Sequence, residues 1–398
     1  MRTYEKTHPW LTFTLDLRKA NHVVWLMLGE AQSKCEYISG VPLRPMTAKQ
    51  LHSVYLAKGA LATTAIEGNT LSEDEVRKRI EGKLKLSPSK EYLGQEIDNI
   101  VEACNSIAEN LFTSGPAKLC VDDIKKFNLL VLKKLPLQEG VIPGEIRTYY
   151  VGVGKYRAAP PEDCNYLLER LCDWLNTEIA EFRQGDKIAL GILKAIVAHL
   201  YLAWIHPFGD GNGRTARLVE FQTLIGSGVP SAAAHLLSNH YNETRTEYYR
   251  QLDSSSQSGG EVMNFVEYAL QGFVDGLKDQ LTVIRKQQLD VTWRNYVHEL
   301  FKDKTSDSQI RRRHLALDLS QIDKPVPLSK LTEVSPRLAA AYSRKTHKTL
   351  IRDVRELMDM DLVEHTKDGI RARKEIILAF LPGRIEENQR ALDFEVKA

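Results

Sequence analysis

The chain is poor in cysteine and in net charge. Only five of its 398 residues are cysteines, and no two of them form a Cys-X-X-Cys pair. This odd, unpaired set predicts reduced thiols in a cytoplasmic setting and argues against a zinc ribbon or a disulfide framework. The formal net charge is only +2, so we expect no strong overall field for nucleic acid or membranes.

The sequence also has little that would place it in a membrane. Its N-terminal residues lack the apolar stretch of a secretory signal, and we read no apolar run as long enough to span a bilayer. We therefore expect a cytoplasmic protein without a membrane partner. With 43% hydrophobic residues, a chain of this length can bury a large core and form two or three domains.

Helical periodicity runs through most of the chain, which predicts a mainly α fold. The expected helices are 20–36, 47–66, one restarting at 72, 91–111, 120–132, 163–182, 186–205, 241–252 and 261–285 with a continuation to 301. Between residues 140 and 161 the pattern changes to two extended stretches, 146–151 and 156–159, around Gly152 and Gly154. This change predicts a small β-hairpin within the helical chain.

A separate unit is expected after the polar stretch 302–308. Helices at 328–334, 336–342 and 347–360, followed by strands at 362–365 and 376–380, would give the element order of a winged helix. Its basic residues favour contact with a DNA backbone, and they are Arg344, Lys345, His347, Lys348, Arg352, Arg371, Arg373 and Lys374. Interleaved acidic residues keep dimerisation and protein docking open as alternatives.

The strongest local signal is the stretch HPFGDGNGRTAR at 206–217. It lies between two helical stretches, so its glycines fall at the N-terminus of the second one. Free backbone N–H groups and the helix dipole favour an anion there, a phosphate above all. The stretch lacks the Gly-Lys-Ser/Thr ending of a P-loop, which disfavours an ordinary NTPase.

The side chains of this stretch suit the transfer of a phosphate-linked group to a hydroxyl. His206, with an ordinary pKa of ~6.5, can take the proton of the attacking hydroxyl. Asp210 can hold Mg²⁺ against the phosphates. Glycine amides, an Asn212 side-chain donor and two forked guanidinium groups can contact phosphate oxygens. The expected nucleotide contacts are His206, Gly211, Asn212, Gly213, Arg214, Thr215, Ala216 and Arg217.

These residues closely resemble the motif of the Fic (filamentation induced by cAMP) family, HxFx(D/E)GNGRxxR, and the resemblance covers most of residues 45–285. Family members are mainly protein adenylyltransferases, which move AMP from ATP to a hydroxyl of a target protein. The resemblance thus implies ATP as substrate, Mg²⁺, and a protein partner with a Ser, Thr or Tyr hydroxyl, which can be the chain itself. It also implies an N-terminal helical region at 1–110, a Fic-type helical catalytic core at 111–300, a winged-helix domain at 310–385 and a charged tail at 386–398.

The segment 63–68, TTAIEG, resembles the inhibitory motif of the family, (S/T)xxxE(G/N), at the end of a helix spanning about 47–67. The resemblance implies that Glu67 reaches Arg217 and occupies the donor that the terminal phosphate of ATP needs. Glu67 would then belong to the nucleotide site as well. In some members the same glutamate supports removal of AMP, which is an alternative activity here. Without the resemblance, the segment is a helix end with an exposed glutamate and a stop glycine.

Two further segments complete the resemblance. The hairpin around 151–157 corresponds to the flap that holds a target by strand addition, although an ordinary surface hairpin has the same pattern. The segment 244–249 resembles one that lines the adenosine pocket in many members, which makes Tyr249 a candidate nucleotide contact or a core residue. Thr244 stands there where many members have asparagine.

Two functions compete with adenylyl transfer from ATP: a DNA-binding regulator whose core senses nucleotide, and an enzyme with another donor such as UTP. Assembly as a homodimer is compatible with each of them.

Overall fold

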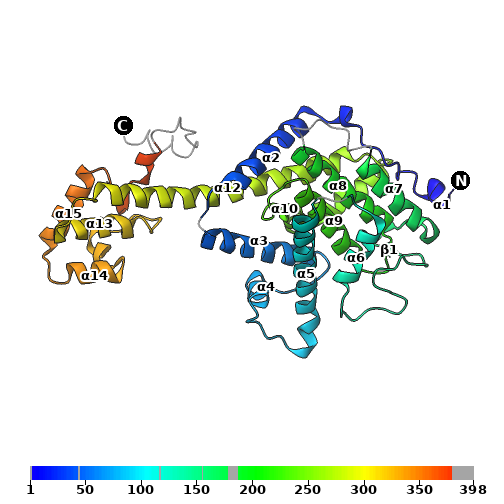
Figure 1. Cartoon of the computed structure of the whole chain (residues 1–398), viewed down its shortest axis with the longest axis horizontal. Helices are drawn as coiled ribbons and strands as arrows, with labels where there is room; N and C mark the ends of the chain where they lie inside the picture. The colour runs from blue at the N-terminus through cyan, green and yellow to red at the C-terminus, as the bar shows by residue number, and fades with distance from the viewer. Residues whose placement is uncertain (1, 44, 116–117, 155, 178–186, 379–398) are drawn as a thin grey trace. The chain divides into compact units, whose positions relative to one another are not determined.

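A computed structural model describes residues 2–43, 45–115, 118–154, 156–177 and 187–378 (Figure 1). Its contacts divide the chain into two compact units, residues 1–281 and 282–398. The long helix α12, Met263–Leu300, begins in the first unit and ends in the second. The division therefore falls inside a helix, upstream of the boundary expected near residue 300. The charged tail expected at 386–398 lies outside the described residues.

The first unit is helical, as predicted. Its further helices are α1 Thr3–Thr7, α2 His22–Gly40, α3 Pro45–Ala65, α4 Glu73–Ile80, α5 Glu91–Ser114, α6 Val121–Val131, α7 Cys164–Asn176, α8 Lys187–Ile205, α9 Asn212–Gly226, α10 Leu236–Glu243 and α11 Arg245–Gln257, with 3₁₀ turns at Leu17–Lys19, Pro88–Lys90 and Pro161–Asp163. The single helix expected over 241–252 was wrong. Thr244 has non-helical φ and ψ of −113° and 37°, so it separates α10 from α11.

Helices α8 and α9 form the centre of this unit and pack along each other (Figure 1). Nearly every residue of α8 from Gly191 to Ile205 is buried. Contrary to our sequence reading, α8 is long and apolar enough to span a membrane by length and composition, yet 72% of that window is buried inside the protein. The 206–217 motif joins these two helices, so its loop is fixed at both ends by the most deeply buried helix pair.

The β-hairpin is smaller than the sequence predicts. Its strands are β1, Gly152–Val153, and β2, Tyr156–Arg157, and they pair antiparallel. The expected strand at 146–151 does not form. Instead, Ile146 makes an isolated bridge with Phe208, and the Arg147 N–H donates to the Pro207 carbonyl at 3.0 Å. Backbone hydrogen bonds at the start of this segment thus go to the motif loop, while at its end the Val151 carbonyl accepts from the Ala158 N–H at 3.2 Å.

Up to residue 378, the second unit contains the end of α12, three further α-helices and one hairpin, and their positions correct the sequence prediction. The elements are α13 Asp307–Leu319, a 3₁₀ turn Leu328–Glu333, α14 Pro336–Tyr342, α15 His347–Asp359, β3 Val363–Thr366, β4 Gly369–Ala372 and a 3₁₀ turn Lys374–Ile377. The expected helix at 328–334 is thus a 3₁₀ turn, and the second strand lies at 369–372 because Thr366 pairs with Gly369 across a two-residue turn. The winged-helix assignment stays a prediction.

Helix α13 was missed because two arginines share its buried face with Leu315, Ala316 and Leu319. Arg311 and Arg312 are both buried and donate to the two carboxylate oxygens of Asp353, at 2.7 Å and 2.9 Å. Tyr342 also donates to Asp353, at 3.0 Å. Apolar periodicity cannot reveal a helix that packs through such a pair, because the arginines read as surface residues.

Candidate active site

The motif loop presents the N-terminus of α9 without a side-chain cap. Gly211 precedes the helix with φ +75°, in the left-handed region that glycine adopts without strain. No side chain accepts from the first N–H groups of α9. The Gly211 N–H itself donates to the Asp210 carboxylate at 2.5 Å. The helix therefore begins with donors that an anionic ligand can use, as the sequence predicts.

The side chain of Asn212 has a different role from the one expected. Its Nδ2 donates to the Phe208 carbonyl at 2.8 Å, and its Oδ1 accepts from the Phe208 N–H at 2.9 Å. Asn212 is buried, as is Phe208. Both polar atoms of the amide thus fix the shape of the loop, a role that the predicted side-chain donor to phosphate did not include.

Thr215 and Ala216 are also turned away from the loop surface. Both are buried in the first turn of α9, and the Thr215 N–H donates to the Gly211 carbonyl at 2.8 Å. Asn128 of α6 donates to the Thr215 hydroxyl at 3.3 Å and to the Asp210 carbonyl at 2.9 Å. The Thr215 hydroxyl and the Asp210 carbonyl thus anchor the start of α9 to α6.

His206 lies at the end of α8 in an uncommon backbone conformation. Its φ is +50°, which costs a non-glycine residue roughly 1–3 kcal/mol. Burial lowers the pKa of its imidazole to about 4. The positive charge of Arg147 also lowers this pKa, whereas the carboxylates of Glu67 and Asp210 raise it. The imidazole is therefore neutral at physiological pH, which is the state that can accept a proton.

Arg147 is the functional residue that sequence reasoning missed. Its Nε donates to the His206 carbonyl at 2.8 Å, its Nη1 to the Tyr149 carbonyl at 2.7 Å and its Nη2 to the Ala159 carbonyl at 2.5 Å. The guanidinium is buried and pairs with no carboxylate among the described residues. One arginine thus ties the motif loop to both ends of the hairpin segment. The sequence offered no signal for this, since a lone arginine in an extended stretch reads as exposed.

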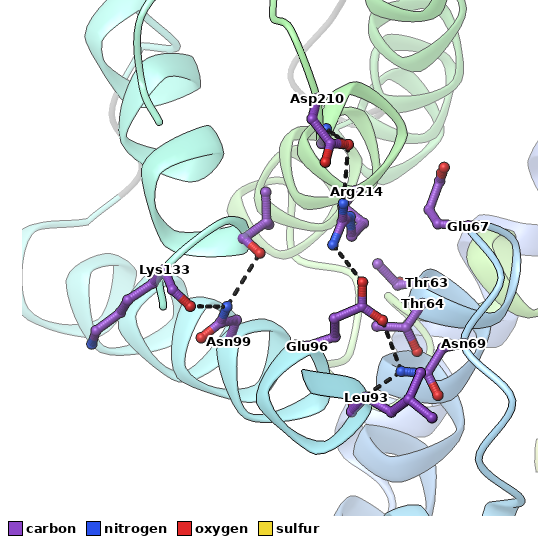
Figure 2. A network of polar contacts seen from close by, with 12 residues as sticks. Thr63, Thr64, Glu67, Asn69, Leu93, Glu96, Asn99, Lys133, Asp210 and Arg214 are labelled. Carbon is purple, nitrogen blue, oxygen red and sulfur yellow. Dashed lines mark hydrogen bonds and ion pairs between the residues drawn. The ribbon is translucent and has the colours of Figure 1, made fainter. Parts of the chain in front are cut away.

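Arg214 belongs to a chain of polar contacts that Figure 2 shows. It donates to Glu96 of α5 at 2.8 Å and to Asp210 at 3.2 Å. Asn69 in turn donates to Glu96 at 2.8 Å and to the Leu93 carbonyl at 2.9 Å. Burial raises the pKa of Glu96, although Arg214 opposes that effect. The network positions the Arg214 guanidinium beside the loop through residues that lie far upstream in the sequence.

Arg217 and Glu67 meet, as the sequence resemblance implied. Nη2 of Arg217 donates to the Glu67 carboxylate at 2.5 Å and to the Thr63 carbonyl at 2.9 Å. A side-chain carbon on Gly213 would lie 2.1 Å from the same Glu67 oxygen. The carboxylate therefore lies directly over the first turn of α9, where only glycine leaves room for it. Nε and Nη1 of Arg217 are buried without a hydrogen-bond partner.

The electrostatics of Glu67 follow from this position. Burial acts to raise the pKa of Glu67, but the charge and hydrogen bond of Arg217 and the charge of Arg214 outweigh it, so the pKa lies below its ordinary value. Glu67 is therefore an anion at neutral pH, and it occupies the place that the helix N-terminus offers to a phosphate. Gly68, with φ +106°, ends the preceding helical turn as predicted.

A cavity of about 420 Å³ lies over this arrangement, and Glu67, His206 and Gly213 line it together with the hairpin residues Val153 and Gly154. Such a volume is typical of small-molecule sites. Tyr248 and Tyr249 also line it. Tyr249 is 40% exposed, whereas Tyr248 is buried and its hydroxyl lies 2.9 Å from His199 Nε2. The structure thus places both tyrosines at the cavity, with Tyr248 also part of the core.

Asp210 is the carboxylate that fits a metal. Half of its side-chain surface is exposed. Within the described ranges, no three His, Cys, Asp or Glu side chains gather in a way that could hold a metal ion. Mg²⁺ commonly binds through one or two carboxylates together with substrate phosphates, so a lone half-exposed aspartate beside a phosphate site suits this ion.

Behind Arg217 lies a second buried polar group that the sequence did not reveal. Glu220 accepts from the Tyr241 hydroxyl at 2.9 Å and lies 3.7 Å from His199 Nδ1. Burial raises the pKa of Glu220 to about 8, although Tyr241 and Arg217 oppose the shift. Glu220 is therefore largely protonated at neutral pH. A neutral carboxyl does not neutralise the charge of Arg217, so that charge can act on groups on the cavity side.

Residues 118–224 match the model of the Fic/DOC family. The protein adenylyltransferase fic-1 of Caenorhabditis briggsae is 34% identical over 210 residues, which are 52% of this chain and 37% of that protein. A Fic family protein from Desulfovibrio desulfuricans has a TM-score of 0.55 at 18% identity, and the match covers 89% of this chain and 94% of that chain. Fic-1 from C. elegans, residues 134–508, has a TM-score of 0.52 at 25% identity, with 65% and 72% covered.

These matches agree with the geometry of the site. The family match contains the whole 206–217 motif, and the similarity in fold extends over most of the chain. The chain spans well under two thirds of the C. briggsae protein, so the similarity does not extend to that protein as a whole. The chain therefore carries a Fic domain, with the motif loop at its centre.

Proposed function

We propose that this protein is an adenylyltransferase that moves AMP from ATP to the hydroxyl of a protein side chain, and that Glu67 restrains it. The observation that supports this most is the meeting of a base, a helix N-terminus and the Glu67–Arg217 pair at one cavity. His206 is a neutral base that lines it, the α9 N-terminus reaches it through Gly213, and Glu67, which also lines it, accepts from Arg217. These are the groups needed to bind a triphosphate and to activate a hydroxyl.

In the proposed reaction, the hydroxyl oxygen attacks the α-phosphorus of ATP while His206 takes the hydroxyl proton. The bond from the α-phosphorus to the oxygen bridging to the β-phosphate breaks, and pyrophosphate leaves with that electron pair. Arg214 and the amides at the start of α9 neutralise the charge of the phosphates. A Mg²⁺ ion bound through Asp210 would neutralise further phosphate charge.

In the proposed restraint, Glu67 and the terminal phosphate of ATP compete for Arg217. Both are bidentate acceptors, and the Glu67 carboxylate already lies over the first turn of α9. ATP bound beside Glu67 would hold its triphosphate out of line with the incoming hydroxyl. The hairpin residues Val153 and Gly154, at the cavity edge, are placed to hold the target segment.

The test is incubation of the full chain with α-labelled ATP, Mg²⁺ and a host lysate. We expect labelled protein that His206→Ala abolishes, since that variant lacks the base. Labelling that persists in His206→Ala would overturn the proposal. Parallel reactions with α-labelled UTP examine the donor, and preferential transfer from UTP would replace ATP in the assignment. The five free cysteines are consistent with the cytoplasmic location that we propose for the reaction.

A further inference from the structure

The second unit contains a cleft lined mainly by basic side chains. Its volume is about 380 Å³, and helices α12, α13 and α14 contribute to it. The charged and titratable residues that line it are Arg294, His298, Arg313, His314, Asp318 and Arg337. Three arginines against one aspartate leave an excess of positive charge, to which the histidines add when protonated.

The charges in this cleft are only partly neutralised. Arg337 donates to both oxygens of Asp318, which also accepts from the Ser335 hydroxyl at 2.6 Å. In the described part of the chain, no carboxylate lies within ion-pair distance of Arg294 or Arg313. Nε of Arg313 is buried and has no hydrogen-bond partner. A desolvated guanidinium donor without a partner is costly, and an anion in the cleft would provide one.

Three cations in and beside the hairpin of this unit are paired. Arg371 donates to Glu364 and Glu375, Lys374 to Asp290, and Arg373 to Asp361. These three cations, which were expected to contact DNA, are therefore neutralised by neighbouring carboxylates. Arg294 and Arg313 of the cleft have no such carboxylate among the described residues.

The surroundings of His314 also indicate a positive field in the cleft. Burial lowers the pKa of His314, and the neighbouring charges of Arg337 and Arg313 lower it further, while Asp318 opposes them. These groups come from different helices, α13 and α14, so their proximity is a product of the fold. No regular spacing in the sequence brings them together.

We propose that this cleft binds a small phosphate-bearing molecule. Guanidinium groups match phosphate oxygens with paired donors, and a concave site of this volume suits a small ligand. A nucleic-acid interface would instead require positive charge spread along an open face. The proposal concerns the second unit alone and does not depend on the activity proposed for the Fic domain.

The test uses inorganic pyrophosphate as the probe and isothermal titration calorimetry of the full chain. An Arg217→Ala background removes a main phosphate ligand of the first unit. We expect saturable binding that weakens by about tenfold or more in Arg294→Gln/Arg313→Gln, because the variant loses two charged groups that can donate to phosphate oxygens. The matched control is Arg352→Gln/Arg355→Gln, which removes the same charge from exposed positions of α15 and should bind as the background does.

Circular dichroism verifies that each variant is folded, and Arg294→Lys/Arg313→Lys provides a charge-preserving alternative if the glutamine variant is not. The lysine variant should bind with intermediate affinity, because it keeps the charge but loses the forked donors. No saturable binding in the background, or equal losses in the cleft and control variants, would overturn the proposal. So would binding of duplex DNA that the cleft variants lose while pyrophosphate does not bind.

Discussion

Nη2 of Arg217 lies 2.5 Å from the Glu67 carboxylate, although the two residues are 150 positions apart in the sequence. Arg217 lies in the second turn of α9 and Glu67 follows α3, so the contact joins the motif to the N-terminal helices. The carboxylate also lies where a side chain on Gly213 would clash. An internal anion thus occupies the N-terminus of the helix on which phosphate binding is expected to depend.

Arg147→Lys should impair transfer more than it impairs ATP binding. Lysine cannot reproduce the planar set of donors to the carbonyls of His206, Tyr149 and Ala159, so the strained His206 backbone would relax. We expect a drop in kcat with a smaller change in KM for ATP, and a loss of about 2 kcal/mol in unfolding free energy. Arg18→Lys, at an exposed pair with Asp16, should change neither. Wild-type kcat in Arg147→Lys would refute this role.

Glu96→Gln should reduce stability and ATP affinity together. Glu96 and Arg214 are 14% and 6% exposed, so loss of the carboxylate leaves a largely buried guanidinium with only its longer ion pair to the half-exposed Asp210. We expect a loss of about 2 kcal/mol, measured by urea unfolding. The control Glu102→Gln breaks a pair with Lys133 whose side chains are 49% and 42% exposed, and it should cost less than ~1 kcal/mol. Equal losses in the two variants would contradict the role of the network.

His206 should stay neutral well below its ordinary titration range. Because burial lowers its pKa to about 4, the imidazole of the folded protein should gain a proton only as the pH falls toward that value. Proton NMR of the histidine Cε1–H signals, with His206→Ala for assignment, should show no shift between pH 8 and pH 5. A midpoint near the ordinary 6.5 would contradict the burial argument.

Glu220 should make the folded protein less stable as the pH rises. Its pKa is raised by burial from 4.5 to about 8, so the folded state binds a proton that the unfolded state has released over that range. The stability from the protonated form is therefore complete below 4.5 and is lost as the pH rises through 8. The difference between the urea midpoints of Glu220→Gln and of the parent should increase steadily from pH 5 to pH 8, in favour of the variant. A constant offset, as expected for the exposed Glu243→Gln, would argue against a raised pKa.

The helices of the first unit could be predicted because their buried faces are apolar. α8 and α5 follow the expected ranges closely, and Gly68 ends its helical turn as glycine spacing suggests. The motif loop could also be placed, because glycine at the start of α9 has a specific conformational role. Sequence rules of this kind predict the structure correctly where a residue type has a single physical role, as glycine has at the start of α9.

The features that the sequence did not predict depend on contacts between residues that are far apart in the chain. Helix α13 was missed because Arg311 and Arg312 are buried against Asp353, and Asn212 was misassigned because its side chain turns back to Phe208. The role of Arg147 depends on three carbonyls that come together only in the fold. Polar side chains can serve the core or a ligand, and only their partners distinguish the two.

Comparison of AMP transfer by Glu67→Gly with transfer by the parent tests the central claim most directly. Both proteins would be incubated with α-labelled ATP and Mg²⁺, with Glu73→Gly as the control at an exposed glutamate and His206→Ala as the blank. If Glu67 competes for Arg217, its removal should raise the initial rate by roughly 5- to 150-fold, the range of a coupling free energy of ~1–3 kcal/mol. The control should match the parent. Equal rates in Glu67→Gly and the parent would contradict the account.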